Sequence, residues 1–255
     1  MNDANSQSPA PKPVGIEAGR LSFSYGPKRV FDNVQFVIPA GEVWGLIGRS
    51  GIGKTTLLNV ILGLFAPDAG SVVTAFGQVN GPGRIRGVVF QEESLLWWLT
   101  IIENALFPNH WNRDDASLHR AKTLLDAAGL GGCADLHPKE LSAGMRRRVE
   151  LVRALLIDQE YFVADEPFSA VDVQTKLALY SVWRDLRKAN PRTGIISTHD
   201  PLEAAVTCDA VIALKGVMDS AAVEIFRVPE RFRKEEPLQT AFSDPFVSKL
   251  VEIIL

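Results

Sequence analysis

The stretch GRSGIGKTT, residues 48–56, decides how this sequence folds. It matches the phosphate-binding loop pattern G-x-x-x-x-G-K-[ST]. A short apolar run, residues 43–47, precedes it, and a helical pattern over residues 54–64 follows it. Glycines let backbone amides curl around phosphate oxygens, and the N-terminus of a helix adds a favourable dipole. The pattern therefore predicts a nucleotide site. The flanking elements disfavour the alternative, a glycine-rich turn with an incidental Lys-Thr pair.

The loop also predicts which groups bind the nucleotide. Lys54 would reach the β- and γ-phosphates, and the hydroxyl of Thr55 would hold Mg²⁺. We therefore expect ATP and Mg²⁺ as the bound species. The loop residues expected to contact them are Gly48, Arg49, Ser50, Gly51, Ile52, Gly53, Lys54, Thr55 and Thr56.

A second motif, YFVADEP at residues 161–167, ends an apolar strand with two adjacent carboxylates. In open α/β sheets the carboxyl ends of the strands are where ligands bind. Asp165 would hold Mg²⁺ through its water shell, and Glu166 could orient or deprotonate the attacking water. An Asp-Glu pair after a strand is also a common helix start. Next to a phosphate loop, the catalytic interpretation is favoured.

Composition sets broad limits. The 255 residues suffice for one large α/β domain or two small ones, and the net charge of −3 argues neither for nor against nucleic acid. Cys133 and Cys208 fit no disulfide or zinc spacing, which is typical of a reducing compartment. No apolar run approaches the roughly 18 residues of a membrane span, and the polar N-terminus is no secretory signal. We expect a soluble, cytoplasmic protein with a disordered tail at residues 1–17.

The coarse pattern predicts an α/β core interrupted by helices. Residues 20–37 indicate a hairpin around Gly26, and residues 86–90, 161–164 and 194–197 indicate further strands. Residues 92–156 have a helical texture, with a helix beginning near Asp114 and stopping at Gly129. Near the C-terminus, residues 222–227 resemble a strand, and Pro245 could begin a closing helix.

These features together resemble the ATP-binding cassette (ABC) ATPases over residues 20 to about 214. The distinguishing stretch is LSAGM, residues 141–145, which stands where the family has a signature of the type L-S-G-G-Q. In the family this signature caps the γ-phosphate of ATP held by a second copy. The resemblance implies that Ser142 and Gly144 complete the site of a homodimer. Ala143 replaces a glycine, which matters where φ is positive, and Met145 replaces the usual Gln.

The resemblance also implies a fold and a division of the chain. The expected fold class is α/β, a P-loop NTPase (RecA-like) core with an antiparallel β subdomain and an inserted α-helical subdomain. The core would comprise residues 18–91 and 157–215, the helical signature subdomain residues 92–156, and a C-terminal extension residues 216–255.

Further family positions match in the same order. Tyr25 falls where an aromatic ring stacks on adenine, although strand packing would also explain it. Gln91 matches the glutamine that reaches Mg²⁺ and the attacking water, and His199 matches the histidine that contacts the γ-phosphate. Alone, a glutamine after a strand means little, and a lone histidine is usually structural. The SAVD stretch, residues 169–172, resembles the loop that crosses the dimer interface.

The stretch after Gln91 indicates the kind of ABC protein. FQEESLLWWLT, residues 90–100, resembles the F-Q-E-x-x-L-L-P-W-L-T stretch of nitrate, sulfonate and taurine importers, with Trp98 at the family tryptophan and Trp97 where proline is usual. The region is too apolar for a free surface, so several residues must pack inside the helical insertion. In the family it also lines the groove that receives a helix from the membrane subunit.

The resemblance implies an ATP-hydrolysing subunit that energises import of a small anion such as nitrate, sulfonate or taurine. It would sit in the cytoplasm on the inner face of the membrane. Its partners would be a second copy, permease subunits and a periplasmic or lipid-anchored substrate-binding protein, with no nucleic acid. Two alternatives stay open: a soluble ABC ATPase of DNA repair or translation, and a weakly active nucleotide-sensing regulatory module.

Overall fold

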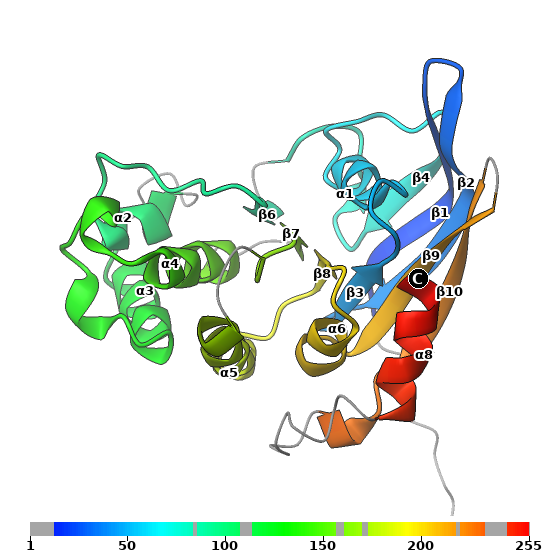
Figure 1. Ribbon diagram of the computed structural model, residues 1–255. Helices are drawn as coiled ribbons and strands as arrows, with labels where there is room; N and C mark the ends of the chain where they lie inside the picture. The colour runs from blue at the N-terminus through cyan, green and yellow to red at the C-terminus, as the bar shows by residue number, and fades with distance from the viewer. Residues whose placement is uncertain are drawn as a thin grey trace, which may run out of the picture.

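The chain is built on two sheets, one mixed and one antiparallel (Figure 1). The computed structural model describes residues 13–83, 86–107, 114–156, 161–169, 173–217, 220–232 and 244–254. The larger sheet has six strands in the order β10-β9-β3-β8-β7-β6, with β9, β3, β8, β7 and β6 parallel and β10 antiparallel to β9. Its strands are β3 (Val43–Ile47), β6 (Arg86–Val89), β7 (Tyr161–Asp165), β8 (Gly194–Ser197), β9 (Ala210–Val217) and β10 (Ser220–Arg227).

The smaller sheet is antiparallel and has the order β2-β1-β4-β5. It contains β1 (Val14–Tyr25), β2 (Lys28–Pro39), β4 (Ala69–Thr74) and β5 (Gly77–Gln78). The predicted hairpin is confirmed, but it begins earlier than expected. Ile16 is fully buried and pairs with Ile38, so residues 14–17 belong to the sheet, and the boundary of the tail at residue 17 was wrong.

The helices begin and end at signals that the sequence carries. The helices are α1 (Lys54–Ile61), α2 (Ile101–Leu106), α3 (Asp115–Ala127), α4 (Ala143–Leu156), α5 (Val173–Ala189), α6 (Pro201–Thr207) and α8 (Pro245–Ile254), with short 3₁₀ turns η2 (Gly131–Cys133), η3 (Pro138–Glu140) and η4 (Glu230–Phe232). Asp114 caps α3 by accepting a 2.7 Å hydrogen bond from the amide of Ser117. Gly129, at φ 71°, stops the chain after it. Pro245 is the first residue of α8, as predicted.

Two hydrophobic cores lie on the two faces of the six-stranded sheet. Successive residues of one strand alternate between them, because side chains of a strand point to opposite faces. Trp44 and Leu46 pack with α1 and the antiparallel sheet, whereas Val43 and Ile47 pack with the helical side. In Figure 1, α2, α3 and α4 form a group at one end of the molecule, away from α1, β1, β2 and β4. The inserted helical subdomain therefore has its own side of the structure.

The C-terminal segment is partly core rather than extension. β10 pairs with β9 along its whole length, from Ser220 opposite Val217 to Arg227 opposite Ala210. The boundary at residue 215 cuts through β9, so that division was wrong at this point. Of the described residues after β10, η4 and α8 are the helical elements, and α8 packs against α6 and β9. Among the residues described, no helix is long and apolar enough to cross a membrane.

Candidate nucleotide-binding site

The order of the parallel strands places the predicted site residues in one row. β3, β8, β7 and β6 are neighbours, and all four have their carboxyl ends at the same edge. The phosphate loop follows β3, His199 follows β8, Asp165 and Glu166 end β7, and Gln91 follows β6. Four segments separated by up to 150 residues in the sequence therefore meet at the edge where ligands of open α/β sheets bind.

The phosphate loop needs its glycines. Gly51 and Gly53 have φ of 77° and 109°, a left-handed region that other residues enter at a cost. A Cβ on Gly53 would also lie 2.5 Å from Cγ1 of Val30, so the loop packs closely on the hairpin. Gly53 is the N-cap of α1, whose first amides are thus available to a ligand.

Lys54 lies folded back over its own loop. Its ammonium is buried and donates to the carbonyls of Gly48, at 2.9 Å, and Arg49, at 3.2 Å. Burial lowers the pKa of Lys54 below its usual value, and the nearby charges of Glu166 and Asp165 oppose part of that change. A ligand carrying negative charge would add counter-charge to that of the two carboxylates and stabilise the buried ammonium further.

Two oxygen-bearing side chains, Thr55 at the start of α1 and Asp165 at the end of β7, suit a hard divalent cation. The hydroxyl of Thr55 donates to Oδ2 of Asp165 at 2.8 Å, and the other oxygen of Asp165 accepts from the hydroxyl of Ser197. Hydroxyl and carboxylate oxygens are the donors that Mg²⁺ prefers. The donor set therefore fits the predicted ion. The side chain of Gln91, the third predicted ligand, is exposed after β6.

Glu166 is held in an unusual backbone conformation facing His199. Its φ is 46°, which costs a non-glycine residue about 1–2 kcal/mol. Its amide donates to the carbonyl and hydroxyl oxygens of Ser197, at 3.1 and 3.0 Å. Its carboxylate Oε1 lies 3.2 Å from Nδ1 of His199. A carboxylate and an imidazole in contact beside a phosphate loop can together orient and deprotonate a water molecule.

The segment that carries His199 is anchored by its neighbour. Asp200 caps α6 by accepting from the amides of Leu202 and Glu203, at 3.0 and 3.3 Å. Lys176 of α5 adds an ion pair to Asp200 at 3.2 Å. The imidazole is therefore free to contact a ligand while its backbone is fixed.

Tyr25 lies at the phosphate loop with its ring half exposed. Its hydroxyl is 3.3 Å from that of Thr56, and its ring makes edge contacts with Phe23 and Phe65. The two phenylalanines hold the ring, and 52% of the residue stays open to solvent. This geometry leaves an aromatic surface for a flat base.

The signature residues lie at the start of α4. Ser142 is the N-cap residue, since its hydroxyl accepts from the amide of Met145 at 3.3 Å. In the described part of the chain, no hydrogen bond or ion pair links Ser142 to the phosphate loop of the same copy. Ala143 is the first helical residue and is exposed, and it is not among the described residues with positive φ. Its methyl group therefore strains nothing within this chain.

The region after Gln91 contains both core and surface residues. Leu95, Leu99 and Ile101 are buried, as the packing interpretation predicts, whereas Trp97 and Trp98 are 50% and 71% exposed. A groove of about 300 Å³ lies alongside, lined by Arg86, Val88, Phe90, Ser94, Leu96, Phe107, Arg153 and Ala154. The dimer-loop prediction for SAVD falls largely on residues 170–172, outside the described residues, and only Ser169 can be placed, donating to the carbonyl of Glu166 at 2.8 Å.

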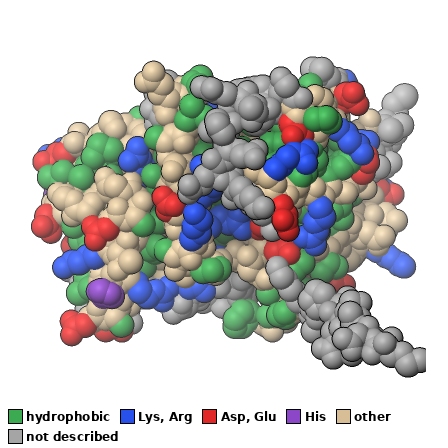
Figure 2. Space-filling model, turned by 90° about the horizontal axis from the view of Figure 1, so that it is seen from below, with side chains coloured by type: hydrophobic (Ala, Val, Ile, Leu, Met, Phe, Trp, Pro, Cys, Tyr) green, Lys and Arg blue, Asp and Glu red, His purple; other side chains and the backbone are tan. Residues whose placement is uncertain are grey.

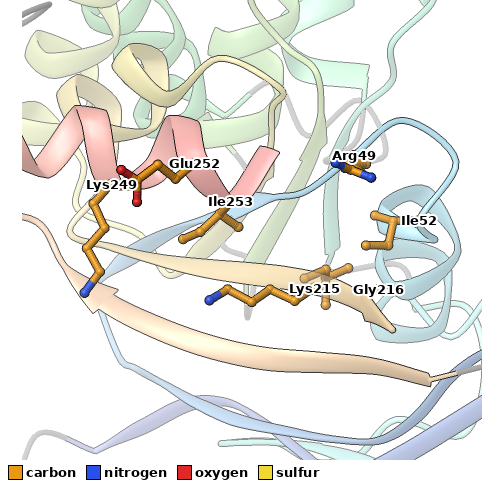
Figure 3. Close-up of a pocket in the computed structure, with 8 residues that line it drawn as sticks. Arg49, Ile52, Lys215, Gly216, Lys249, Glu252 and Ile253 are labelled. Carbon is orange, nitrogen blue, oxygen red and sulfur yellow. The ribbon is translucent and has the colours of Figure 1, made fainter. Parts of the chain in front are cut away.

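A separate hollow of about 470 Å³ flanks the phosphate loop (Figure 3). Arg49 and Ile52 of the loop, Lys215 and Gly216 of β9, and Lys249, Glu252 and Ile253 of α8 surround it in Figure 3. Lys54 and Thr55 do not line it, so it lies beside the predicted phosphate site and does not coincide with it.

On the face seen from below, basic side chains gather near the middle with acidic ones beside them (Figure 2).

Two contributors escaped prediction from the sequence. Ser197 bonds both Asp165 and the amide of Glu166, and its signal is only its place at the end of an apolar strand, two residues before His199. Arg147, the middle of three consecutive arginines, donates to the backbone carbonyls of Phe90 and Glu166, on the segments after β6 and β7. The sequence signal for a buried Arg147 is Glu150, one helical turn further on, because a buried arginine needs an acidic partner.

Together, the fold and the site define a P-loop nucleotide-binding ATPase. Comparison with known proteins makes the assignment specific. The sequence matches the family described as "ABC transporter" over residues 31–169, more than half of the chain. The chain therefore belongs to the ABC transporter family.

Curated relatives are similar to this chain in sequence, and a solved structure is similar to it in fold. The chain is 38% identical to the aliphatic sulfonates import ATP-binding protein SsuB 1 of Pseudomonas aeruginosa, over 76% of this chain and 79% of that one. It is 32% identical to the taurine import ATP-binding protein TauB of Burkholderia pseudomallei, over 89% and 90%. Its fold is similar to that of cbiO1 from Clostridium perfringens, part of the ABC transporter complex cbiONQ, with a TM-score of 0.73, 20% identity, and 94% and 100% of the two chains covered.

Proposed function

We propose that this ATPase works as a homodimer that energises import of a small anion, of the sulfonate or taurine type or nitrate, through partner permease subunits. The observation that carries the proposal is the meeting of Glu166, His199, Asp165 and Thr55 at the carboxyl edge of the sheet, beside the phosphate loop. The printed names of the relatives, which are import proteins for sulfonates and taurine, support the substrate class.

Each residue of the site then has a task in hydrolysis. The loop amides and Lys54 bind the phosphates, and Lys54 exchanges the carbonyls of Gly48 and Arg49 for phosphate oxygens. Bound Mg²⁺, held by Thr55, Asp165 and Gln91, would neutralise phosphate charge. Glu166 accepts a proton from the attacking water while the oxygen of that water bonds to the γ-phosphorus and the bond between the γ-phosphorus and the β–γ bridging oxygen breaks, which releases ADP. His199 orients Glu166 and contacts the γ-phosphate.

The second copy supplies what one chain lacks. Ser142 and the amides near Gly144 stand at an exposed helix N-terminus, a ready anion site, yet they face no phosphate loop of their own chain. In a head-to-tail dimer each signature would close over the γ-phosphate held by the other copy. Each site would then be complete only when two chains and ATP are together.

The groove after Gln91 is the proposed docking place of the permease. Phe90 contributes exposed apolar surface to its lining, together with Arg86 and Arg153, and Trp97 and Trp98 of the following segment are exposed. An amphipathic helix with an acidic residue matches that combination. The chain would then sit in the cytoplasm on the inner face of the membrane, and a periplasmic or lipid-anchored binding protein would deliver the substrate on the other side.

The two alternatives have less support. A soluble ABC ATPase of repair or translation has less support because the relatives' printed names are those of import proteins. A regulatory module with weak turnover would tolerate loss of the catalytic carboxylate, whereas Glu166 is present and in contact with His199.

Mass in solution tests the dimer. Glu166→Gln removes the base and should trap the closed state, so light scattering should show a shift from monomer to dimer with ATP and Mg²⁺. Adding Ser142→Arg should abolish that shift without abolishing ATP binding. A monomer in every condition, with ATP bound, would contradict the homodimer.

Uptake tests the transport role. In the organism of origin, deletion of the gene should abolish uptake of one labelled anion among taurine, an alkanesulfonate and nitrate. Wild-type protein should restore it, and Glu166→Gln should not. Unchanged uptake of all three would overturn the proposed substrate class.

A further inference from the structure

Arg147 is a buried arginine at the junction of three functional segments. It lies on α4, five residues after Ser142, and is only 7% exposed. Burying a guanidinium is unfavourable unless its donors are satisfied. The contacts that satisfy them show what this side chain holds together.

Four of its partners are backbone carbonyls of the two catalytic segments. On the segment after β6, Arg147 donates to the carbonyls of Phe90 at 2.8 Å and Gln91 at 3.5 Å. On the segment after β7, it donates to those of Glu166 at 3.1 Å and Pro167 at 2.5 Å. The guanidinium thus bridges the backbones that carry Gln91 and Glu166, and it ties both to the signature helix.

Glu150 neutralises the charge and extends the bridge. It is 1% exposed, and its Oε2 accepts from Arg147 at 2.7 Å. Its other oxygen accepts from the amide and hydroxyl of Ser94, at 2.6 and 2.9 Å. Arg153, also on α4, donates to the carbonyl of Ser94 at 2.9 Å. The segment after Gln91 is therefore fixed to α4 at two places, Phe90–Gln91 and Ser94.

A buried ion pair of this kind adds little stability compared with well-packed apolar residues, because desolvation offsets the attraction. Its distinguishing property is geometric, since a planar fork with five donors fixes several acceptors at once. The neighbouring Arg148 shows the contrast: it donates to the carbonyl of Ala128, at 3.2 Å, inside the helical subdomain.

We propose that Arg147 is a positioning residue that makes the start of α4, the Gln91 segment and the Glu166 segment move as one body. In the homodimer of the proposed function, on which this inference rests, ATP bound by the partner meets Ser142 and Gly144 at one end of this unit. The other end carries Gln91 and Glu166 of the chain's own site. Occupancy of one site thereby sets the catalytic geometry of the other.

The test separates ATP binding, dimerisation and turnover in the full-length chain. Arg147→Gln should bind a fluorescent ATP analogue like wild type, and in the Glu166→Gln background it should still dimerise with ATP and Mg²⁺. Its kcat should fall by about 10- to 100-fold, because misplacement of catalytic groups by about 1 Å can cost 100-fold. Any cooperativity of turnover with ATP concentration should also disappear. Arg147→Lys, which cannot reach four carbonyls, should behave similarly.

The matched control is Arg148→Gln, which makes the same change one residue away and should keep the kcat and cooperativity of wild type. Should Arg147→Gln fail to fold, Arg147→Lys keeps a positive charge beside Glu150 and carries the same test. Normal kcat and cooperativity with dimerisation intact would overturn the inference, as would loss of dimerisation in Arg147→Gln alone. Absence of a dimer in the Glu166→Gln parent would instead refute the proposed homodimer, and the inference with it.

Discussion

Nδ1 of His199 lies 3.2 Å from Oε1 of Glu166, although 33 residues separate them in the sequence. The two come from the ends of adjacent parallel strands, β8 and β7. The amide of Glu166 donates to the hydroxyl of Ser197, and the backbone of His199 is fixed by Asp200, which caps α6. The contact is therefore held by the ends of two paired strands. The two side chains are thus positioned before a ligand binds, as the proposed catalytic pair requires.

His199→Gln should lower turnover without weakening ATP binding. The substitution removes the imidazole that orients the Glu166 carboxylate, and loss of one preorganised group of this kind typically costs about 100-fold in kcat. Steady-state ATPase assays and equilibrium ATP titration separate the two effects. His119→Gln is the control, because His119 is exposed on α3 in the helical group. Equal losses in both variants would argue against a catalytic place for His199.

Gly53→Ala should destabilise the ligand-free protein more than Gly51→Ala does. Both positions have positive φ, so both variants carry a backbone cost of about 1–2 kcal/mol. At Gly53 the new methyl also meets Cγ1 of Val30 at 2.5 Å, and overpacking adds about 1–3 kcal/mol. A Cβ added at Gly51 would have no atom within 4 Å apart from those of its neighbours in the chain. Urea unfolding measures the free energy of unfolding of each variant. Equal values would show that Val30 moves aside at no cost when a methyl group is added at position 53.

Ala143→Gly should leave ATPase activity and ATP-dependent dimerisation near those of wild type. The sequence raised the question whether alanine in LSAGM impairs the signature, and the exposed helical position of Ala143 answers it within one chain. Glycine should cost at most about 1 kcal/mol of stability, through its lower helix propensity. Side-by-side ATPase and thermal unfolding assays check this. A large gain in kcat would mean that the methyl group obstructs the partner's nucleotide.

The phosphate loop, several strands and some helix boundaries could be predicted because their signals are local. Short apolar runs indicated the strands of the parallel sheet, and Asp114, Gly129 and Pro245 marked helix ends. The contacts within the site could not be predicted from residues alone, because they depend on strand order. Ser197 touches Asp165 only since β8 lies next to β7. Arg147 is one of three consecutive arginines, and only tertiary packing buries it. The boundaries at residues 17 and 215 were wrong because β1 already begins at Val14, opposite the end of β2, and β9 continues to Val217, where it pairs with β10.

The Asp244–Arg231 pair should make the attachment of α8 depend on pH. Asp244 accepts two 2.7 Å hydrogen bonds from Arg231 and caps α8 through the amide of Phe246, at 2.8 Å. Hydrogen bonding from Arg231 lowers the pKa of Asp244 below its usual value. The folded state thus favours the charged form. Its contribution to stability is present above the unfolded pKa of about 3.9 and is lost as the pH falls below it.

Two substitutions separate the cap from the charge. At pH 7, Asp244→Ala should destabilise by about 1 kcal/mol through loss of the cap alone, and Asp244→Asn, which keeps an acceptor for Phe246, by less. The difference between wild type and Asp244→Asn should shrink at pH 3, because Asp244 of the unfolded chain is then mostly protonated and the native preference for the charged form stabilises less. Thermal unfolding at both pH values measures it. A difference that is the same at pH 3 and pH 7 would show that the charge of Asp244 does not hold α8.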